Sequence, residues 1–119
     1  MTRMTTLERR RALFDEAVAI IEAEYDRPLD LDDVAYRVAT SRRQLQRAFA
    51  ECGDTTFRTY LAEVRMRRAR ELLAEGVTPV AEVGRSVGYR QPAQFSKAFR
   101  RTYGAPPSQL NRPDGSQRG

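Results

Sequence analysis

The sequence predicts an all-α fold of about seven helices, in which two similar subdomains are joined by one long helix. An internal repeat is the main observation behind this prediction. Val34-Ala35-x-x-Val38-Ala39 precedes a polar turn and Leu45-Gln46-Arg47-Ala48-Phe49, while Val83-Gly84-x-x-Val87-Gly88 precedes a similar turn and Phe95-Ser96-Lys97-Ala98-Phe99. Each copy therefore has the pattern of a short helix, a turn, and a second helix with one apolar and one polar face. That pattern is typical of a helix-turn-helix.

The first half of the chain contains start and stop signals for three helices. Apolar residues spaced by three or four predict a helix over residues 8–25, and Pro28 follows its end. Asp30 is a suitable N-cap for a helix over residues 31–38. Ser41 is a suitable N-cap for the next helix, which we expect to reach residue 51.

The second half begins with the long connecting helix, predicted over residues 57–75 and stopped by Gly76. Thr78 is expected to cap the following helix, with Pro79 at its first position. Pro92 is expected in the first turn of a helix that reaches Tyr103. A short last helix is predicted from Pro107 to Asn111.

These elements give the expected domain organisation. Residues 1–12 form a lead-in, residues 13–112 form the two-subdomain unit, and residues 113–119 form a disordered tail. The two helix-turn-helix units are expected at residues 31–52 and 79–103.

The charge distribution favours a polyanionic partner. The net charge is +5, but residues 1–36 carry nine acids and five bases, whereas residues 37–119 carry seven acids and sixteen bases. The excess of positive charge therefore coincides with both polar helix faces. Two helix-turn-helix units in such a chain predict sequence-specific binding of double-stranded DNA.

Composition argues against several other classes of protein. His is absent and Cys52 is the single cysteine, which removes common metal ligands, the commonest general base and any internal disulfide. We therefore expect no enzyme activity, no catalytic residue, no metal and no cofactor. The chain lacks an apolar run of about 18 residues and an apolar N-terminal segment, so we expect a cytoplasmic, nucleoid-associated protein without membrane contact.

The connecting helix suggests how both units reach one duplex. Its 19 predicted residues span about 28 Å at about 1.5 Å per residue. This length is comparable to one DNA turn of about 34 Å. A single chain is therefore expected to bind two successive major-groove segments as a monomer.

Several motifs occur in order along the chain. They are Ser41-Arg-Arg-Gln-Leu-Gln-Arg-Ala-Phe49, Phe57-Arg-Thr-Tyr-Leu61, Val80-Ala-Glu-Val-Gly-x-x-Val-Gly-Tyr89, Phe95-Ser-Lys-Ala-Phe-Arg-Arg-Thr-Tyr-Gly104 and Pro107-Ser108. From Phe14 to Arg112 the chain resembles the DNA-binding domain of the AraC/XylS family of bacterial transcription regulators, and its length resembles single-domain members similar to MarA and SoxS. The resemblance implies a transcription regulator that acts as an activator by recruiting RNA polymerase.

The same resemblance implies which residues face the bases. These are Arg43, Gln46 and Arg47 in the first unit and Ala93, Gln94 and Lys97 in the second; with phosphate and rim contacts, the expected DNA-binding set is Arg42, Arg43, Gln46, Arg47, Arg90, Ala93, Gln94, Ser96, Lys97 and Arg101. Arg can bond bidentately to guanine and Gln to adenine. We expect the first unit to provide most of the base readout, because Lys97 alone is a long donor at the equivalent positions of the second unit.

Two positions depart from the family pattern. Asp54 occupies a place where the family usually has Gly, and an Asp tolerates the left-handed conformation better than most residues. Arg90 and Gln91 stand where small capping residues are common, and Gln is a weak cap. Arg90 is a candidate phosphate contact there.

Alternative interpretations remain open for some basic residues and for the function as a whole. The arginines of the connecting helix can form a solvated face or contact phosphates. Arg9, Arg10 and Arg11 are expected to lie on the surface at the start of the first helix and not to contact DNA. A helical protein-interaction module is a second functional class. A third class is an enzyme or a fragment of one, because the same domain occurs fused to an alkyl-transfer repair domain. We reject this class, because that activity needs several cysteines and the chain has one. The operator, the regulated genes, the sign of regulation, any effector and the completeness of the chain are not determined by the sequence.

Overall fold

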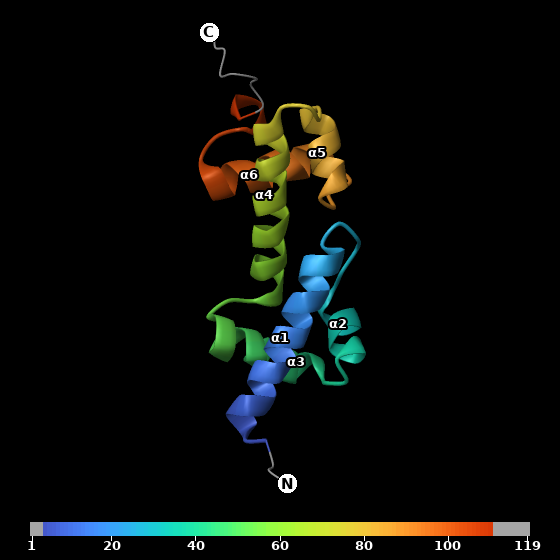
Figure 1. Cartoon of the computed structure of the whole chain (residues 1–119), viewed down its shortest axis with the longest axis vertical. Coiled ribbons are helices and arrows are strands. Elements are labelled where there is room, and N and C mark those ends of the chain that lie inside the picture. The colour runs from blue at the N-terminus through green and yellow to red at the C-terminus, as the bar shows by residue number, and fades with distance from the viewer. Residues whose placement is uncertain (1–3, 111–119) are drawn as a thin grey trace. The chain divides into compact units, whose positions relative to one another are not determined.

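The computed structural model describes residues 4–110, and every regular element among them is helical, which confirms the predicted fold class. In chain order these elements are α1 (Thr6–Glu24), α2 (Leu31–Arg37), α3 (Arg42–Gly53), α4 (Phe57–Glu75), α5 (Val80–Ser86), α6 (Pro92–Tyr103) and the 3-10 helix η1 (Pro107–Gln109) (Figure 1). The chain divides into two compact units, Met1–Leu61 and Ala62–Gly119, so that α4 begins in the first unit and continues in the second. The expected tail at residues 113–119 lies outside the described residues.

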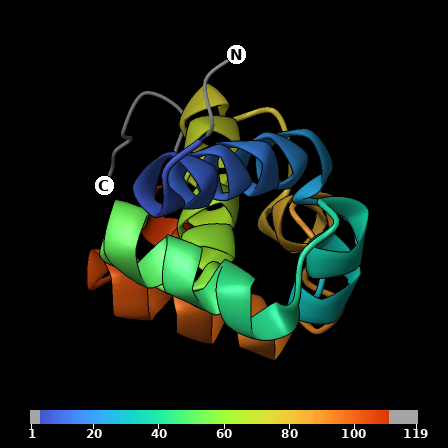
Figure 2. The ribbon, with the colours of Figure 1, turned by 90° about the horizontal axis from the view of Figure 1, so that it is seen from below.

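The first unit is built on the packing of α3 against α1, which lie side by side in Figure 2. Phe49 on α3 is fully buried at its centre. The ring of Phe49 makes edge-on contacts with Phe14 at 5.1 Å, Phe57 at 5.9 Å and Tyr60 at 6.0 Å between centroids. These contacts bring α1, α3 and the start of α4 into one core, in which edge-to-face ring geometry is favourable.

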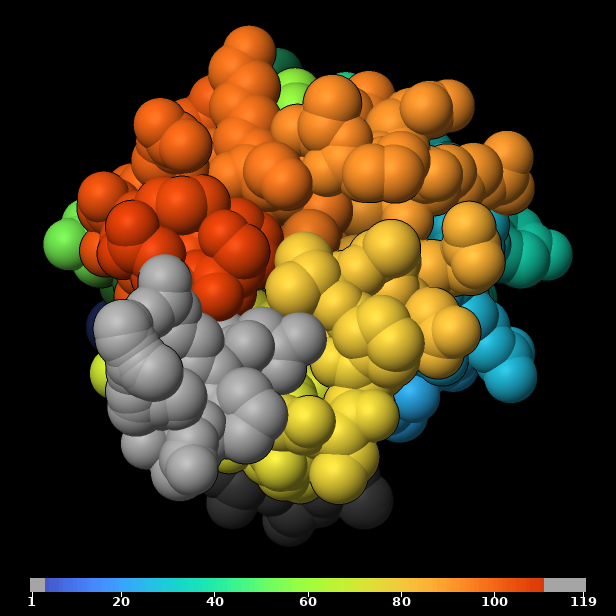
Figure 3. Space-filling view, turned by 90° about the horizontal axis from the view of Figure 1, so that it is seen from above, coloured from blue at the N-terminus to red at the C-terminus, as the bar shows by residue number. Residues whose placement is uncertain are grey.

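In the second unit, α6 carries the buried aromatic residues. Phe95 and Phe99 are buried, and their rings lie 5.8 Å apart. The series continues to Tyr89 on one side and to Tyr103, 4.7 Å from Phe99, on the other. The end of α4, α5 and α6 form the surface of this unit seen in Figure 3.

Helix boundaries follow local capping chemistry. Asp30 Oδ1 accepts a hydrogen bond from the Asp33 amide at 2.8 Å, and Ser41 Oγ accepts one from the Gln44 amide at 3.0 Å, which confirms both predicted N-caps. Gly76 has the left-handed φ of +74° expected of the stop after α4. Asp54 has the left-handed φ of 52° and ends α3 as its C-cap.

Some predicted boundaries were wrong. α1 begins at Thr6, two residues before the predicted start, because Thr5 and Glu8 form a capping box. α5 begins at Val80, and Pro79 occupies its N-cap with an extended ψ of 148°, so the predicted cap at Thr78 was displaced by one residue. Within the described residues, the predicted last helix is a single 3-10 turn that ends at Gln109.

An ion pair ties the end of α1 to α2. Arg37 donates two hydrogen bonds to the Glu24 carboxylate, from Nη1 to Oε1 at 2.8 Å and from Nη2 to Oε2 at 2.6 Å. This contact lowers the pKa of Glu24 and raises the pKa of Arg37. The bidentate geometry links the last residue of α1 to the last residue of α2.

The two helix-turn-helix turns use the same hydrogen bonds. The Thr40 amide bonds to the Ala35 carbonyl and the Tyr89 amide to the Gly84 carbonyl, each at 2.9 Å. Both turns also place a left-handed residue at the equivalent position, Ala39 with φ 60° and Gly88 with φ 109°. The first unit therefore holds an alanine in a conformation that the second assigns to glycine.

Packing between the helices of each unit is also matched. A Cβ atom on Gly84 would lie 2.8 Å from the Phe95 ring, so glycine is required beside this large side chain. The first unit has Ala35 and the smaller Leu45 at the equivalent repeat positions. Each unit therefore pairs a small residue on its first helix with a larger one on its second helix. The first unit has more side-chain volume on the first helix and less on the second helix than the second unit has.

Replacing Ala39 with Gly is expected to stabilise the protein by about 0.5–1 kcal/mol, because a left-handed conformation costs a non-glycine residue about 1–2 kcal/mol, partly offset by the greater freedom of glycine in the unfolded chain. Urea unfolding measures this difference. Ala19→Gly, at an exposed position inside α1, is the control and is expected to lose about 1 kcal/mol. A loss of stability in both variants would contradict the strain at Ala39.

Replacing Gly84 with Ala is expected to destabilise the protein by about 1–3 kcal/mol, because the added methyl group meets the Phe95 ring. Helix propensity alone predicts the opposite, a gain of about 1 kcal/mol. The double variant Gly84→Ala/Phe95→Leu recreates the pairing of the first unit and should recover part of the loss. Urea unfolding of both single variants and the double variant measures this coupling. Additive losses would show that the two positions do not compensate.

Candidate nucleic-acid interface

Burial of one stripe of α3 determines which side chains face outward in the first unit. Leu45, Ala48 and Phe49 are fully buried on that helix. Its exposed face contains Arg42, Arg43, Gln46, Arg47 and Ala50. The structure thus brings the four residues predicted from this helix onto one accessible surface, which we call the α3 face.

Two arginines of the α3 face are already engaged by carboxylates. Arg42 Nη1 lies 2.9 Å from Asp32 Oδ1 on α2. Arg47 Nε lies 3.8 Å from Glu51 Oε2, one turn further along α3. Arg43, in contrast, pairs with no carboxylate among residues 4–110. Partially exposed pairs of this kind are weak, so a stronger acceptor can displace the carboxylates.

Asp32 and Glu51 were not predicted as part of the site. The Arg47–Glu51 spacing of four residues in one helix was a usable signal. No local signal joins Asp32 to Arg42, because that pair depends on how α2 and α3 meet across the turn. Glu51 also accepts a hydrogen bond from Arg10 Nη1 on α1, and this connection likewise requires the tertiary fold.

In the second unit, burial of Phe95 and Phe99 turns the opposite side of α6 outward. The α6 face comprises the exposed residues Ala93, Gln94, Ser96, Lys97 and Arg101, and exposed Arg90 lies in the turn before the helix. All six predicted residues of this unit are therefore accessible. Gln91 makes no side-chain cap hydrogen bond to α6, consistent with the weak cap expected there.

The second unit is the more basic of the two. It holds eleven bases and five acids, whereas the first holds ten bases and eleven acids. From Val83 to Pro113 the sequence contains six bases and no Asp or Glu. Within the part of the chain that the structure describes, Arg90, Lys97 and Arg101 form no ion pair. Their charges are therefore available to a polyanion without the loss of an internal contact.

The arginines of α4 are not all solvated charges. The guanidinium of Arg65 lies over the Tyr89 ring at 5.5 Å, and that of Arg70 lies over the Tyr103 ring at 5.1 Å. Arg68 pairs with Glu71 at 3.0 Å. Cation–π contact at these distances gives Arg65 and Arg70 a packing role within the second unit.

Neither a metal centre nor a membrane-spanning helix is found among the described residues. No group of three or more His, Cys, Asp or Glu side chains is arranged there to hold a metal ion. No helix there is long and apolar enough to cross a membrane.

Two helix-turn-helix units with outward basic faces define a class of DNA-binding domain. Residues 34–113 of the chain match the protein family described as "Helix-turn-helix domain". The chain belongs to this family and is of the AraC type, in agreement with the resemblance found in its sequence.

Individual relatives agree with this assignment. The HTH-type transcriptional regulator ArgR of Pseudomonas aeruginosa is 35% identical over 92 residues, which are 77% of this chain and 28% of that protein. An AraC-type transcriptional regulator from Chromobacterium violaceum has a similar structure, with a TM-score of 0.80 and 33% identity over 92% of this chain and 96% of the other. The DNA-binding domain of AdpA, solved in complex with a target DNA, has a TM-score of 0.78 and 28% identity over 82% of this chain and 88% of the other. The chain spans about a quarter of the length of the curated relatives that it matches.

Replacing Asp32 with Asn is expected to raise duplex affinity two- to five-fold, because a surface ion pair of about 0.2–1 kcal/mol no longer holds Arg42. Fluorescence anisotropy with a labelled duplex at fixed salt measures the change. Asp26→Asn is the control, since this exposed residue carries the same charge and is not one of the carboxylates paired with an arginine of the α3 face. An equal gain in both variants would mean that net charge, and not release of Arg42, sets the effect.

Proposed function

We propose that this chain is a sequence-specific regulator of transcription that binds double-stranded DNA as a monomer, with α3 and α6 in successive major-groove segments. The carrying observation is that each unit buries one stripe of its second helix and exposes Arg, Gln, Ser or Lys on the other. These are side-chain types that read base edges. The likeness to the AdpA domain, which was solved with a target DNA, supports DNA as the ligand.

The two faces are proposed to contribute differently. Arg42 and Arg47 must break their ion pairs with carboxylates before they bind DNA. Their binding is therefore most favourable where a base offers a better bidentate acceptor. Arg90, Lys97 and Arg101, which form no ion pair among the described residues, can bind any phosphate within reach. The α3 face therefore provides most of the base readout, and the α6 face mainly provides affinity and register.

Selection of bound duplexes from a random pool of about 30 base pairs tests this division. Arg47→Ala is expected to relax the preference at one or two positions, since a bidentate base contact gives about 1–3 kcal/mol of discrimination. Lys97→Ala is expected to weaken binding to all sequences similarly and to reduce the slope of log affinity against log salt by about 1.

Equal loss of sequence preference in the two variants would contradict the division of labour. A failure to enrich any sequence, together with weak salt dependence, would favour the alternative of a protein-interaction module. Circular dichroism of each variant serves as the control for folding, because both residues are exposed and their removal should leave helicity unchanged.

Activation by contact with RNA polymerase, in the cytoplasm and at the nucleoid, completes the proposal and is supported by the family resemblance. Run-off transcription from a template that carries the selected site tests this part. More transcript in the presence of the protein is the expected result, and less transcript would identify a repressor.

A further inference from the structure

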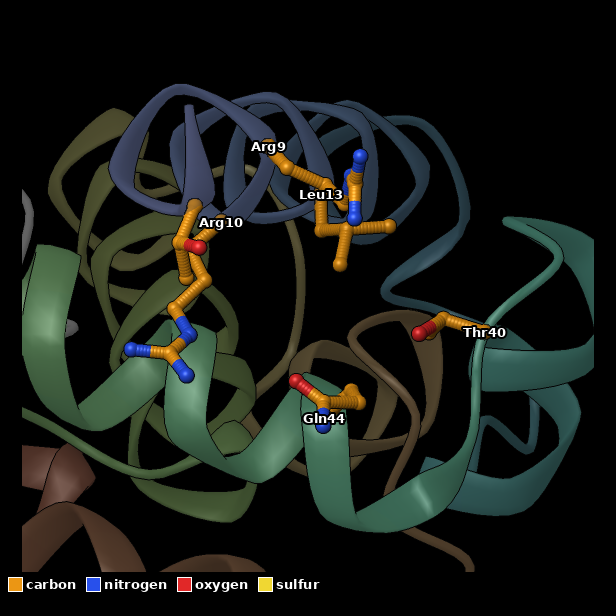
Figure 4. A pocket seen from close by; sticks show the side chains of 6 residues that line it. Arg9, Arg10, Leu13, Thr40 and Gln44 are labelled. Carbon is orange, nitrogen blue, oxygen red and sulfur yellow. The ribbon is translucent and has the colours of Figure 1, made fainter. Parts of the chain in front are cut away.

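A pocket lies on the first unit, apart from the residues predicted to bind DNA. It has a volume of about 410 Å³ and is lined by Thr6, Arg9, Arg10, Leu13, Thr40 and Gln44. The first four residues belong to α1, Thr40 belongs to the helix-turn-helix turn, and Gln44 belongs to the first turn of α3. Figure 4 shows Thr40 and Gln44 facing α1 across this space. The volume is within the range of small-molecule sites.

The lining has the chemistry of an anion receptor. Its lining holds two guanidinium groups, two hydroxyl groups and one amide, with Leu13 as the one aliphatic side chain. No carboxylate belongs to the lining, although Arg10 also pairs through Nη1 with Glu51 outside it. The Nε–H of Arg10 is buried and has no hydrogen-bond acceptor within residues 4–110. A buried donor without an acceptor costs free energy, which an anionic ligand would recover.

From these observations we propose that the pocket binds a small organic anion that bears carboxylate or phosphate groups. Arg9 and Arg10 provide the charge, the hydroxyl groups and the Gln44 amide provide orientation, and Leu13 contacts the carbon skeleton. A free anion fits better than a DNA phosphate, because the site is a concave pocket between α1 and α3. Gln44, which lines this pocket, precedes the buried Leu45 and is not one of the residues of the α3 face.

The pocket is connected to the α3 face by one carboxylate. Glu51 accepts a hydrogen bond from Arg10 through Oε1, and its Oε2 lies 3.8 Å from Arg47. An anion that draws Arg10 away leaves Glu51 to pair more strongly with Arg47. The bound anion would then reduce the availability of Arg47 to a base, a consequence that rests on the proposed function.

Titration of ¹⁵N-labelled protein with succinate, and separately with inorganic phosphate, at constant ionic strength tests the site without DNA. We expect saturable shifts of the Thr40 and Gln44 amide signals, with an affinity reduced at least ten-fold in Arg9→Gln and in Gln44→Ala. Arg11→Gln is the matched control, because Arg11 lies on the same helix, pairs with Asp15 and does not line the pocket. Arg9 and Gln44 are exposed, so their substitution should leave the fold intact.

Three results would overturn the site. The first is linear, unsaturated shifts of the amide signals with both anions. The second is the same anion affinity in Arg9→Gln and Arg11→Gln. The third is no saturable anion binding together with a duplex salt slope lowered by about 1 in Arg9→Gln, which would assign the arginine to a DNA phosphate.

A second measurement tests the connection to Arg47. At constant ionic strength, succinate is expected to weaken duplex binding by the wild type about three-fold or more and to have no such effect on Glu51→Gln. Saturable binding of succinate with equal effects on both proteins would refute the connection and leave the site intact. Absence of duplex binding by the wild type at any salt concentration would refute the proposed function, whereas the titration without DNA still decides the site.

Discussion

Burial of the apolar stripe on the second helix of each unit is the constraint on which the rest of the structure depends. Phe49 is completely buried among three other rings, and Phe99 is completely buried between Phe95 and Tyr103. Burying one such side chain contributes about 1.5–3 kcal/mol. Because successive residues of a helix are separated by about 100°, rotating α3 by one residue would expose Phe49 and bury a charged side chain. The inward residues therefore determine the outward face.

The repeats solve the same packing problem with different side chains. Both turns close with equivalent hydrogen bonds, but the larger side chain of the inter-helix contact is Phe95 in one unit and Leu45 in the other. Their surfaces differ more strongly, since the first unit pairs two of its outward arginines, Arg42 and Arg47, with carboxylates, whereas the second has no acid from Val83 to Pro113. Core geometry is preserved between the copies, whereas their electrostatic properties are not.

The features that depend on local sequence could be predicted. Apolar spacing located the helices, Asp30 and Ser41 indicated their caps, and the buried residues of α3 and α6 followed from the repeat. The Thr5–Glu8 capping box was visible in the sequence and was missed, which placed the start of α1 too late. The left-handed Ala39 was also missed, although Gly88 at the equivalent position was a signal for it.

Features that join distant parts of the chain could not be predicted in this way. The Arg42–Asp32 pair, the Arg10–Glu51 contact and the stacking of Arg65 on Tyr89 depend on how packed helices bring side chains together. The same is true of the pocket between α1 and α3. The roles of the outward residues toward DNA remain predictions, because they concern a ligand and not the fold.

Methylation interference on a selected duplex tests the central claim most directly, because it modifies guanine N7 in the major groove. The account predicts interference in two clusters whose centres are about 10–11 base pairs apart, with one protein chain bound per duplex. A single cluster would mean that one helix alone reads the major groove. Interference confined to minor-groove adenine positions would contradict the assignment of the α3 and α6 faces to base readout.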